Sequence, residues 1–440
     1  MSEPKRVLIL GAAGRDFHNF NTFYRGNPAY RVVAFTATQI PDIAGRKYPN
    51  ELAGSLYPEG IPILEESEAA DIIRREKIDE AVFAYSDVTN DYVMNLASLC
   101  MAAGADFRVL GAKSTMIEST RPVIAITAVR TGAGKSQTTR YISRILKEMG
   151  KKVVAIRHPM PYGDLAKQAC QRFETYADLE LHKCTIEERE EYEPHIDNGF
   201  IIYSGVDYEM ILRQAEAEAD VILWDGGNND LPFYKSDLHI VIADPHRPGH
   251  EMSYFPGQTN FRMADVIIIN KCDSVKDEAD ILSIEANAAK HNPKAIVVRA
   301  NSPVTTEKPE LVKGKKALVI EDGPTLTHGS MSYGAGVVAA KSVGAAEIVD
   351  PTPYAVASIA ATYKKYPNAK GILPAMGYGD QQIKDLEATI DATPCDVVLS
   401  GTPIDITRVL KVNKPMVRAS YELAEINPGK LAEAIKKVIK

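Results

Sequence analysis

The sequence predicts an α/β protein in which three successive segments each fold into a mostly parallel sheet covered by helices. Short runs of apolar, β-branched residues alternate along the chain with stretches of helical periodicity, which is typical of parallel sheets. The chain has 440 residues, of which 45% are hydrophobic and 25% charged. That length suits roughly two to four domains, each with a hydrophobic core of its own.

The first segment covers residues 1–118 and is predicted to be a Rossmann-like domain. Its predicted strands and helices lie over residues 7–11, 31–36, 68–77, 80–85, 91–103 and 107–111. The turn from Gly11 to Gly14 lacks the third glycine of a dinucleotide-binding fingerprint, so NAD binding is not expected. Arg15, His18 and Asn19 follow this turn, which leaves two interpretations open: an anion site, or a tight turn with a basic rim.

The second segment covers residues 121–305 and contains a phosphate-binding loop, which predicts a P-loop nucleotide-binding domain. An apolar strand over residues 123–129 runs into Arg130-Thr131-Gly132-Ala133-Gly134-Lys135-Ser136, and a helix is predicted from Ser136 to Met149. Glycines let backbone N–H groups point at a polyphosphate, and the helix N-terminus favours the anion. Lys135 is expected on the β- and γ-phosphates and Ser136 on Mg²⁺, and we expect Thr131 to Gln137 to bind the nucleotide.

The loop departs from the usual pattern at its start. Val129 stands where glycine or alanine is common, and Arg130 lies five residues before Lys135. This arrangement resembles ATPases that carry a second basic residue in the loop, and it predicts a catalytic role for Arg130 beside Lys135. Because such ATPases share residues across a dimer, a homodimer is expected by analogy.

Charged residues follow the other predicted strands of this segment, which lie over residues 152–156, 220–225, 239–244, 265–270 and 295–299. Ligands of open parallel sheets bind outside the carboxyl ends of the strands. Asp225, which precedes two glycines, is expected to act in catalysis and to hold Mg²⁺ together with Ser136. The basic residues at these ends are expected to bind an anionic second substrate: Arg157, His158, His246, Arg247 and His250.

The segment Asn270-Lys271-Cys272-Asp273 bears on the choice of nucleotide. It matches the base-recognition motif of GTPases, in which the aspartate accepts hydrogen bonds from guanine. An Asn-Lys pair at this place can also contact adenine. The motif predicts nucleotide binding by Asn270, Lys271 and Asp273 and leaves both ATP and GTP open.

The third segment covers residues 317–440 and is predicted to be a C-terminal α/β domain, after a polar linker over 302–316. Strands are predicted over 317–321, 346–349, 371–373 and 397–400, and a last helix over 429–439. The glycine-rich stretch 321–336, with Thr327, His328 and Ser330, is either a backbone cradle for an anion or a flexible connection. The Glu-rich stretch 174–193 in the second segment is predicted to be a solvated surface of helix and loop.

Bulk properties exclude several classes of function. The net charge of −7 argues against nucleic-acid binding, and neither a polybasic membrane signal nor an apolar run of spanning length is present. The five cysteines form no C-x-x-C pair, so free thiols in a reducing compartment are expected. The N-terminus has no signal-peptide pattern, which predicts a cytoplasmic location.

The whole chain resembles the cyclic 2,3-diphosphoglycerate synthetase family, whose members are often labelled predicted GTPases. The resemblance depends on the phosphate loop, on Trp-Asp-Gly-Gly-Asn-Asn-Asp (224–230), on Asp-Pro-His-Arg-Pro-Gly-His-Glu (244–251) and on Glu-Asp-Gly-Pro-Thr-Leu-Thr-His-Gly (321–329). It implies an ATP-dependent ligase that closes an intramolecular phosphoanhydride in 2,3-diphosphoglycerate, with ATP and Mg²⁺ as cofactors and the basic residues named above on the substrate. Two alternatives remain: a regulatory or chaperone-type GTPase, and a kinase or ligase for another anionic metabolite.

Overall fold

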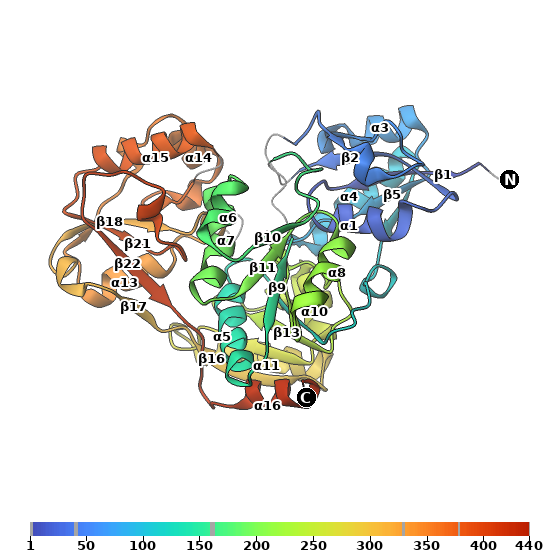
Figure 1. Ribbon diagram of the computed structural model, residues 1–440. Coiled ribbons are helices and arrows are strands. Elements are labelled where there is room, and N and C mark those ends of the chain that lie inside the picture. Colours follow the sequence, from blue (N-terminus) through green and yellow to red (C-terminus); the bar gives the residue numbers. More distant parts are fainter. Residues whose placement is uncertain (1–2, 39–42, 159–162, 328–330, 377–378, 440) are drawn as a thin grey trace.

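The computed structural model describes residues 3–38, 43–158, 163–327, 331–376 and 379–439, which form three sheets covered by helices (Figure 1). The first sheet has the strand order β3-β4-β2-β1-β5-β7, and all its pairings are parallel except that of β3 with β4. Its elements are β1 (Lys5–Leu10), α1 (Arg15–Asn19), β2 (Tyr30–Ala37), β3 (Lys47–Tyr48), α2 (Asn50–Ala53), β4 (Ile61–Glu65), α3 (Ala69–Glu76), β5 (Glu80–Phe83), β6 (Val88–Thr89), α4 (Asn90–Ala103) and β7 (Asp106–Val109).

The central sheet has the order β10-β11-β9-β12-β8-β13-β15-β16-β23, with antiparallel pairing only at the two edges. Its elements are β8 (Val123–Ala128), α5 (Lys135–Glu148), β9 (Val153–Arg157), β10 (Gln171–Phe173), α6 (Tyr176–Leu181), α7 (Ile186–Asp197), β11 (Ile201–Ser204), α8 (Tyr208–Glu218), β12 (Val221–Asp225), β13 (Leu238–Ala243), α9 (His250–Ser253), β14 (Tyr254–Phe255), α10 (Gly257–Met263), β15 (Val266–Ile269), α11 (Glu278–His291) and β16 (Ile296–Asn301). The strands β8, β12 and β13 are buried along their whole length, because helices cover both faces.

The third sheet has the order β17-β22-β21-β18-β19, and β20 also pairs with β18. Its elements are β17 (Val304–Thr306), β18 (Lys316–Glu321), α12 (Gly323–Thr327), α13 (Ala335–Val343), β19 (Glu347–Ile348), α14 (Ala357–Lys365), β20 (Leu373–Pro374), α15 (Asp380–Ala392), β21 (Val397–Ser400) and β22 (Met416–Tyr421). The predicted fold class, α/β with mostly parallel sheets, is thus confirmed. Among the described residues, no helix combines the length and apolar character needed to cross a membrane.

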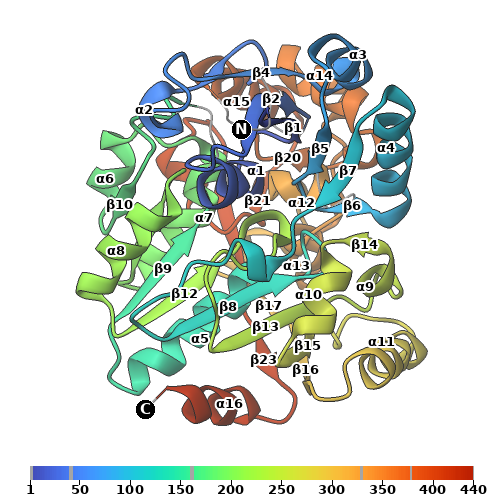
Figure 2. The same cartoon turned by 90° about the vertical axis from the view of Figure 1, so that its right-hand side faces the viewer.

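The phosphate loop follows β8, which lies between β12 and β13 in the sheet. The chain leaves β8 toward β9 on one side and later crosses to β13 on the other, so the loop sits where ligands bind in open α/β sheets. In Figure 2, β9, β12, β8 and β13 run across the lower half, with the first sheet above them. The first and second segments are joined by the two-stranded pairing of β6 with β14.

The C-terminal end of the chain returns to the central sheet. The strand β23 (Ala424–Glu425) pairs with β16, and α16 (Lys430–Val438) lies beneath the central sheet near α5 (Figure 1). Its buried side chains, Leu431, Ala434 and Ile435, belong to the same hydrophobic cluster as Ile124 and Ile126 of β8. The central core therefore includes residues of both the 121–305 and the 317–440 segment.

We expect Ile435→Ala to lower the free energy of unfolding by about 2–5 kcal/mol, because it opens a cavity in this core. The exposed neighbour Lys436 on the same helix supplies the control, and Lys436→Ala should change stability by less than about 0.5 kcal/mol. Denaturant unfolding of both variants measures the difference. Equal stabilities would mean that α16 is not part of the central core.

Candidate nucleotide and substrate site

The backbone of the phosphate loop is held open by two side chains from the loop after β15. Gly134 has φ +113°, and a Cβ there would lie 2.1 Å from Nδ2 of Asn270, so this position requires glycine. Asn270 Nδ2 donates to the carbonyl of Ala133 at 3.0 Å, and Lys271 Nζ donates to the carbonyl of Gly132 at 2.5 Å. The Asn-Lys pair thus fixes the shape of the phosphate loop.

Asp225 at the end of β12 is fully buried and gathers the cations on one side of the loop. Lys135 Nζ donates to its Oδ1 at 2.5 Å, while Arg157 Nη1 and His195 Nε2 lie 3.4 and 3.5 Å from its Oδ2. Burial alone would raise the pKa of Asp225, but Lys135 and Arg157 hold it well below its usual value. Arg157 is also bound to Glu191 on α7, with 2.5 Å between Nη2 and Oε1.

Asp244 at the end of β13 has the same role on the other side. Its Oδ1 accepts from the backbone N–H of His246 at 3.0 Å and lies 2.9 Å from Nδ1 of that ring. Its Oδ2 accepts from Arg247 at 3.0 Å and from Lys271 at 3.1 Å. Burial opposes ionisation, but Lys271, His246 and Arg247 lower the pKa of Asp244 far below its usual value. Two buried carboxylates therefore flank the loop.

Arg130 is bound to the first segment. Its Nε donates to Asp87 Oδ1 at 2.6 Å, its Nη1 lies 2.9 Å from Nδ1 of His250, and its guanidinium carbon lies 3.8 Å from the centre of the Tyr254 ring. Burial, and next the charge of Arg130, lower the pKa of His250 to about 4, so this ring is neutral at neutral pH. Arg130 links two segments and has a buried carboxylate as its partner.

A cavity of about 840 Å³ lies between the phosphate loop and the third sheet. Among the residues predicted to bind nucleotide or substrate, those that line it are Arg130, Thr131, Gly132, Gly134, Lys135, Ser136, Gln137, Arg157, His158, His246, Lys271 and Asp273. Those that do not line it are Ala133, Asp225, Arg247, His250 and Asn270. Asp273 is exposed at the rim, where its Oδ1 accepts from the backbone N–H of Ser302 at 3.1 Å.

The wall opposite the loop is acidic, and sequence reasoning missed it. Glu187, Glu191, Glu321 and Asp322 line the cavity, and we call these four residues the acidic wall. Behind them, burial and then the charges of Asp322 and Glu187 raise the pKa of Glu190 well above its usual value. The wall combines one face of α7 with the end of β18.

The prediction of a solvated surface over residues 174–193 is wrong for α7. Nine of the twelve residues of this helix are buried, because it lies between two cores: Ile186 packs in the core of the third sheet and Tyr192 in that of the central sheet. A capping box formed by Thr185 and Glu188 begins the helix. The isolated apolar residues among the glutamates were the available signal of burial.

In the glycine-rich stretch 321–336, backbone N–H groups bind a carboxylate of the protein itself. The carboxylate of Glu321 accepts backbone N–H groups of Gly334, Gly336 and Val337 at 3.0, 3.1 and 2.8 Å, at the N-terminus of α13. These donors are therefore already bound. His328 and Ser330, which we considered as further donors, lie outside the described residues.

The turn between β1 and α1 is likewise occupied by a side chain of the protein itself. The Asp16 carboxylate accepts the backbone N–H of Ala13 at 2.5 Å and of Phe17 at 2.7 Å, and a Cβ on Gly11 would lie 2.6 Å from it. His18 is buried and stacks on Phe233 of the central segment. The corner is thus a buried contact between segments.

The two residues predicted to hold Mg²⁺ differ in accessibility. Ser136 lines the cavity at the start of α5, whereas Asp225 is buried behind Lys135. A hydroxyl and a carboxylate are oxygen donors that suit this cation. Among the described residues, no group of three or more His, Cys, Asp or Glu side chains is placed so that it could hold a metal ion.

Several known proteins are similar to this chain. No protein-family model matches the chain. Arginine synthetase ArcE from Thermococcus kodakarensis is 64% identical over 433 residues, which cover 98% of this chain and 96% of that protein. Cyclic 2,3-diphosphoglycerate synthetase from Thermococcus onnurineus is 22% identical over 252 residues, covering 50% of this chain and 57% of the relative. Among solved structures, LpxK from Aquifex aeolicus in complex with ATP covers 74% of this chain and 90% of its own at 13% identity, with a TM-score of 0.43.

We expect Lys135→Met to lower ATP-dependent turnover by about 10²–10³-fold, because the cation next to the phosphate loop is lost. Lys147 lies exposed near the other end of the same helix, so Lys147→Met is the matched control and should leave turnover unchanged. ADP release measured with both variants tests this expectation. Full activity of Lys135→Met would exclude the loop as the site of phosphoryl transfer.

Proposed function

We propose that this chain, which belongs to the same family as arginine synthetase ArcE and the cyclic 2,3-diphosphoglycerate synthetases, is an ATP-dependent synthetase that forms arginine. The family resemblance noted in the sequence is confirmed by these relatives, and their names describe synthetases. The choice of arginine as product is supported by the similarity to ArcE over nearly the whole chain and by the charges of the cavity.

The observation that carries this proposal is the acidic wall facing the phosphate loop. A guanidinium group, or the ammonium group of an amino acid, is attracted by Glu187 and Asp322, whereas Glu191 is already paired with Arg157 and Glu321 is bound by backbone N–H groups. Beside this wall, burial and next the negative charges of Asp322 and Glu187 raise the pKa of Glu190. An incoming cation would relieve this repulsion.

The chemistry follows from the product. Arginine differs from the ureido amino acid citrulline by one nitrogen in place of the carbonyl oxygen. The ureido oxygen attacks the γ-phosphorus of ATP and expels ADP, which gives a phosphorylated isourea. Ammonia then forms the new C–N bond at the same carbon. The C–O bond to phosphate breaks, and hydrogen phosphate leaves with the bonding electrons and one proton from the attacking nitrogen.

The phosphate loop and the acidic wall would bind different substrates. Gly132, Gly134 and Lys135 would bind the phosphates, and Ser136 would hold Mg²⁺, which neutralises charge on the phosphates when bound. Asp225 lies behind Lys135 and would reach the cation only through water. The acidic wall would hold the amino acid, with its ureido oxygen toward the γ-phosphate. Phosphoryl transfer needs mainly this positioning and charge neutralisation.

A second candidate is the synthesis of cyclic 2,3-diphosphoglycerate. It is favoured by three relatives of that name, which are 22–23% identical over 50–56% of this chain. The five basic residues expected on that substrate already have partners: Arg157 with Glu191 and Asp225, His158 with Asp230, His246 and Arg247 with Asp244, and His250 with Arg130. We therefore rank it second.

The proposal is tested by incubating the protein with ATP, Mg²⁺, citrulline and ammonium chloride and by measuring arginine and ADP. Glu187→Gln should raise the KM for citrulline about 10- to 100-fold, because a charged hydrogen-bond partner on the acidic wall is lost. The next residue, Glu188, is also buried on α7 but caps the helix, and Gln preserves that cap, so Glu188→Gln should leave this KM unchanged.

Two outcomes would contradict the proposal. The wild-type protein could form no arginine but produce cyclic 2,3-diphosphoglycerate from 2,3-diphosphoglycerate and ATP, which would establish the second candidate. Alternatively, nucleotide hydrolysis without stimulation by either substrate would favour a regulatory GTPase.

The nucleotide itself can be tested at Asp273. Because Asn270 and Lys271 are occupied by the phosphate loop, we propose ATP as the nucleotide and expect Asp273→Ala to change the affinity for ATP by less than threefold. Calorimetric titration of the wild type and the variant with ATP and with GTP measures this. A guanine preference in the wild type that disappears in Asp273→Ala would show that Asp273 reads the base and that GTP is the substrate.

A further inference from the structure

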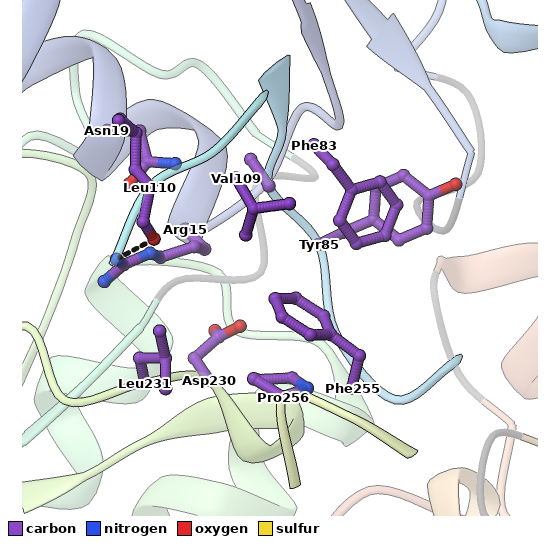
Figure 3. A pocket seen from close by; sticks show the side chains of 11 residues that line it. Arg15, Asn19, Phe83, Tyr85, Val109, Leu110, Asp230, Leu231, Phe255 and Pro256 are labelled. Atoms are coloured by element: carbon purple, nitrogen blue, oxygen red, sulfur yellow. Dashed lines mark hydrogen bonds between the residues drawn. The ribbon is translucent and has the colours of Figure 1, made fainter. Parts of the chain in front are cut away.

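A second, much smaller cavity lies between the first and central segments, with a volume of about 10 Å³. This is room for a single molecule of the size of water. Arg15 and Asn19 of α1 form one side, Asp230 and Leu231 the opposite side, and aromatic side chains that include Phe255 close it. Figure 3 shows the Asp230 carboxyl group pointing into the space that Arg15, Val109 and Phe255 surround.

The polar groups around this cavity are incompletely bonded. Asn19 is 1% exposed and Arg15 6% exposed, yet Oδ1 of Asn19 and Nη1 of Arg15 have no hydrogen-bond partner in the described part of the chain. The other Arg15 nitrogen, Nη2, donates to Thr115 Oγ1 at 2.8 Å. Buried polar groups of this kind cost free energy unless a small molecule bonds to them. The residues that line this cavity thus include one donor and one acceptor without a partner in the described part of the chain.

The small cavity adjoins the nucleotide cavity through one side chain. His158 lines the large cavity, and its Nε2 lies 3.7 Å from Oδ2 of Asp230. The ring packs so closely on Gly227 that a Cβ there would lie 1.7 Å from Nε2. The backbone on either side of Asp230 is fixed too, because Asn260 Nδ2 donates to the carbonyls of Asn229 and Asp230. His158 thus stands between the two spaces.

We propose that this small cavity binds the nitrogen nucleophile of the reaction, ammonia, with Asp230 as the group that accepts a proton from ammonium. The inference rests on the proposed function, which requires such a nucleophile. Ammonia has one lone pair, which accepts from Arg15 Nη1, and N–H bonds that donate to Asn19 Oδ1 and Asp230. Ammonium gives one proton to the Asp230 carboxylate, and the resulting ammonia passes the His158 side chain into the nucleotide cavity, where it attacks the phosphorylated carbon in the step balanced above.

The environment of Asp230 suits this proton transfer. Burial raises the pKa of Asp230 to about 7, although a hydrogen bond from Ser86 and the charge of Arg15 oppose the rise. A base with a pKa near the working pH both accepts and releases protons readily. The enclosed volume also selects by size, since methylammonium is larger than ammonium by one carbon atom.

The test measures arginine formation as a function of ammonium concentration at saturating ATP and citrulline. Asn19→Ala and Asp230→Asn should each lower kcat/KM for ammonium at least tenfold, and the KM values for ATP and citrulline should stay within twofold of the wild type. Asp207 supplies the control, because it pairs with Arg25 across the same contact between segments, at 3.3 Å, but does not line the cavity. Asp207→Asn should leave kcat/KM for ammonium unchanged.

A second measurement needs no variant. The wild-type protein should use methylammonium at less than one hundredth of its rate with ammonium, and comparable rates would overturn the size selection. Unchanged kcat/KM for ammonium in both variants would mean that the cavity holds only a structural water, and this inference would fail while arginine formation by the wild type stands. Absence of arginine formation by the wild type would overturn the proposed function and, with it, this inference.

Discussion

The phosphate loop depends on two buried carboxylates that flank it. Asp225 on β12 binds Lys135 and Arg157, and Asp244 on β13 binds Lys271, which in turn holds a loop carbonyl. Because β8 lies between these strands, the loop is fixed from both sides. Removing one partner of a buried ion pair leaves an uncompensated buried charge and costs about 3–5 kcal/mol, so each of these carboxylates depends on its cation.

This network also decides which charges remain for a second substrate. The cations at the strand ends are engaged by Asp225, Asp244, Glu191 and their neighbours, so they stabilise the protein's own anions. The remaining side of the cavity carries the four carboxylates of the acidic wall together with Lys341 of α13. The site thus separates negative and positive ligands onto opposite walls, which suits a reaction between a polyphosphate and a nitrogen-rich amino acid.

The sequence predicted those features that are local in the chain. The apolar run before Arg130 and the glycines after it predicted the strand, turn and helix around the phosphate loop, and the charged residues after other strands predicted a polar sheet edge. Lys135→Met and its control therefore test a prediction that needed no structure. The helix after the loop was predicted from Ser136 to Met149. In the structure α5 begins at Lys135 and ends at Glu148, so each end differs from the prediction by one residue.

Features that depend on distant contacts could not be predicted in this way. The pattern of α7 is that of a solvated helix, because its glutamates are buried only when the cores around Ile186 and Tyr192 meet on it. Arg130, which is predicted to act in catalysis beside Lys135, lines the cavity, and its ion-pair partner Asp87 comes from another segment. Pairing across segments depends on how the sheets dock, and no local pattern encodes that docking.

The turn after β1 lies where dinucleotide-binding domains carry their glycine-rich fingerprint, but in this protein the turn is buried by the docking of the first segment on the central one. Asp16 fills the turn after β1, and Arg15 and Asn19 face Asp230 of the central segment. A dinucleotide would need this corner open to solvent, whereas here it is buried against the central segment. The third segment supplies Glu321 and Asp322 of the acidic wall, and α7 of the central segment supplies Glu187 and Glu191. The first segment thus reaches the phosphate loop through the ion pair of Asp87 with Arg130, whereas the third segment lines the cavity beside the loop.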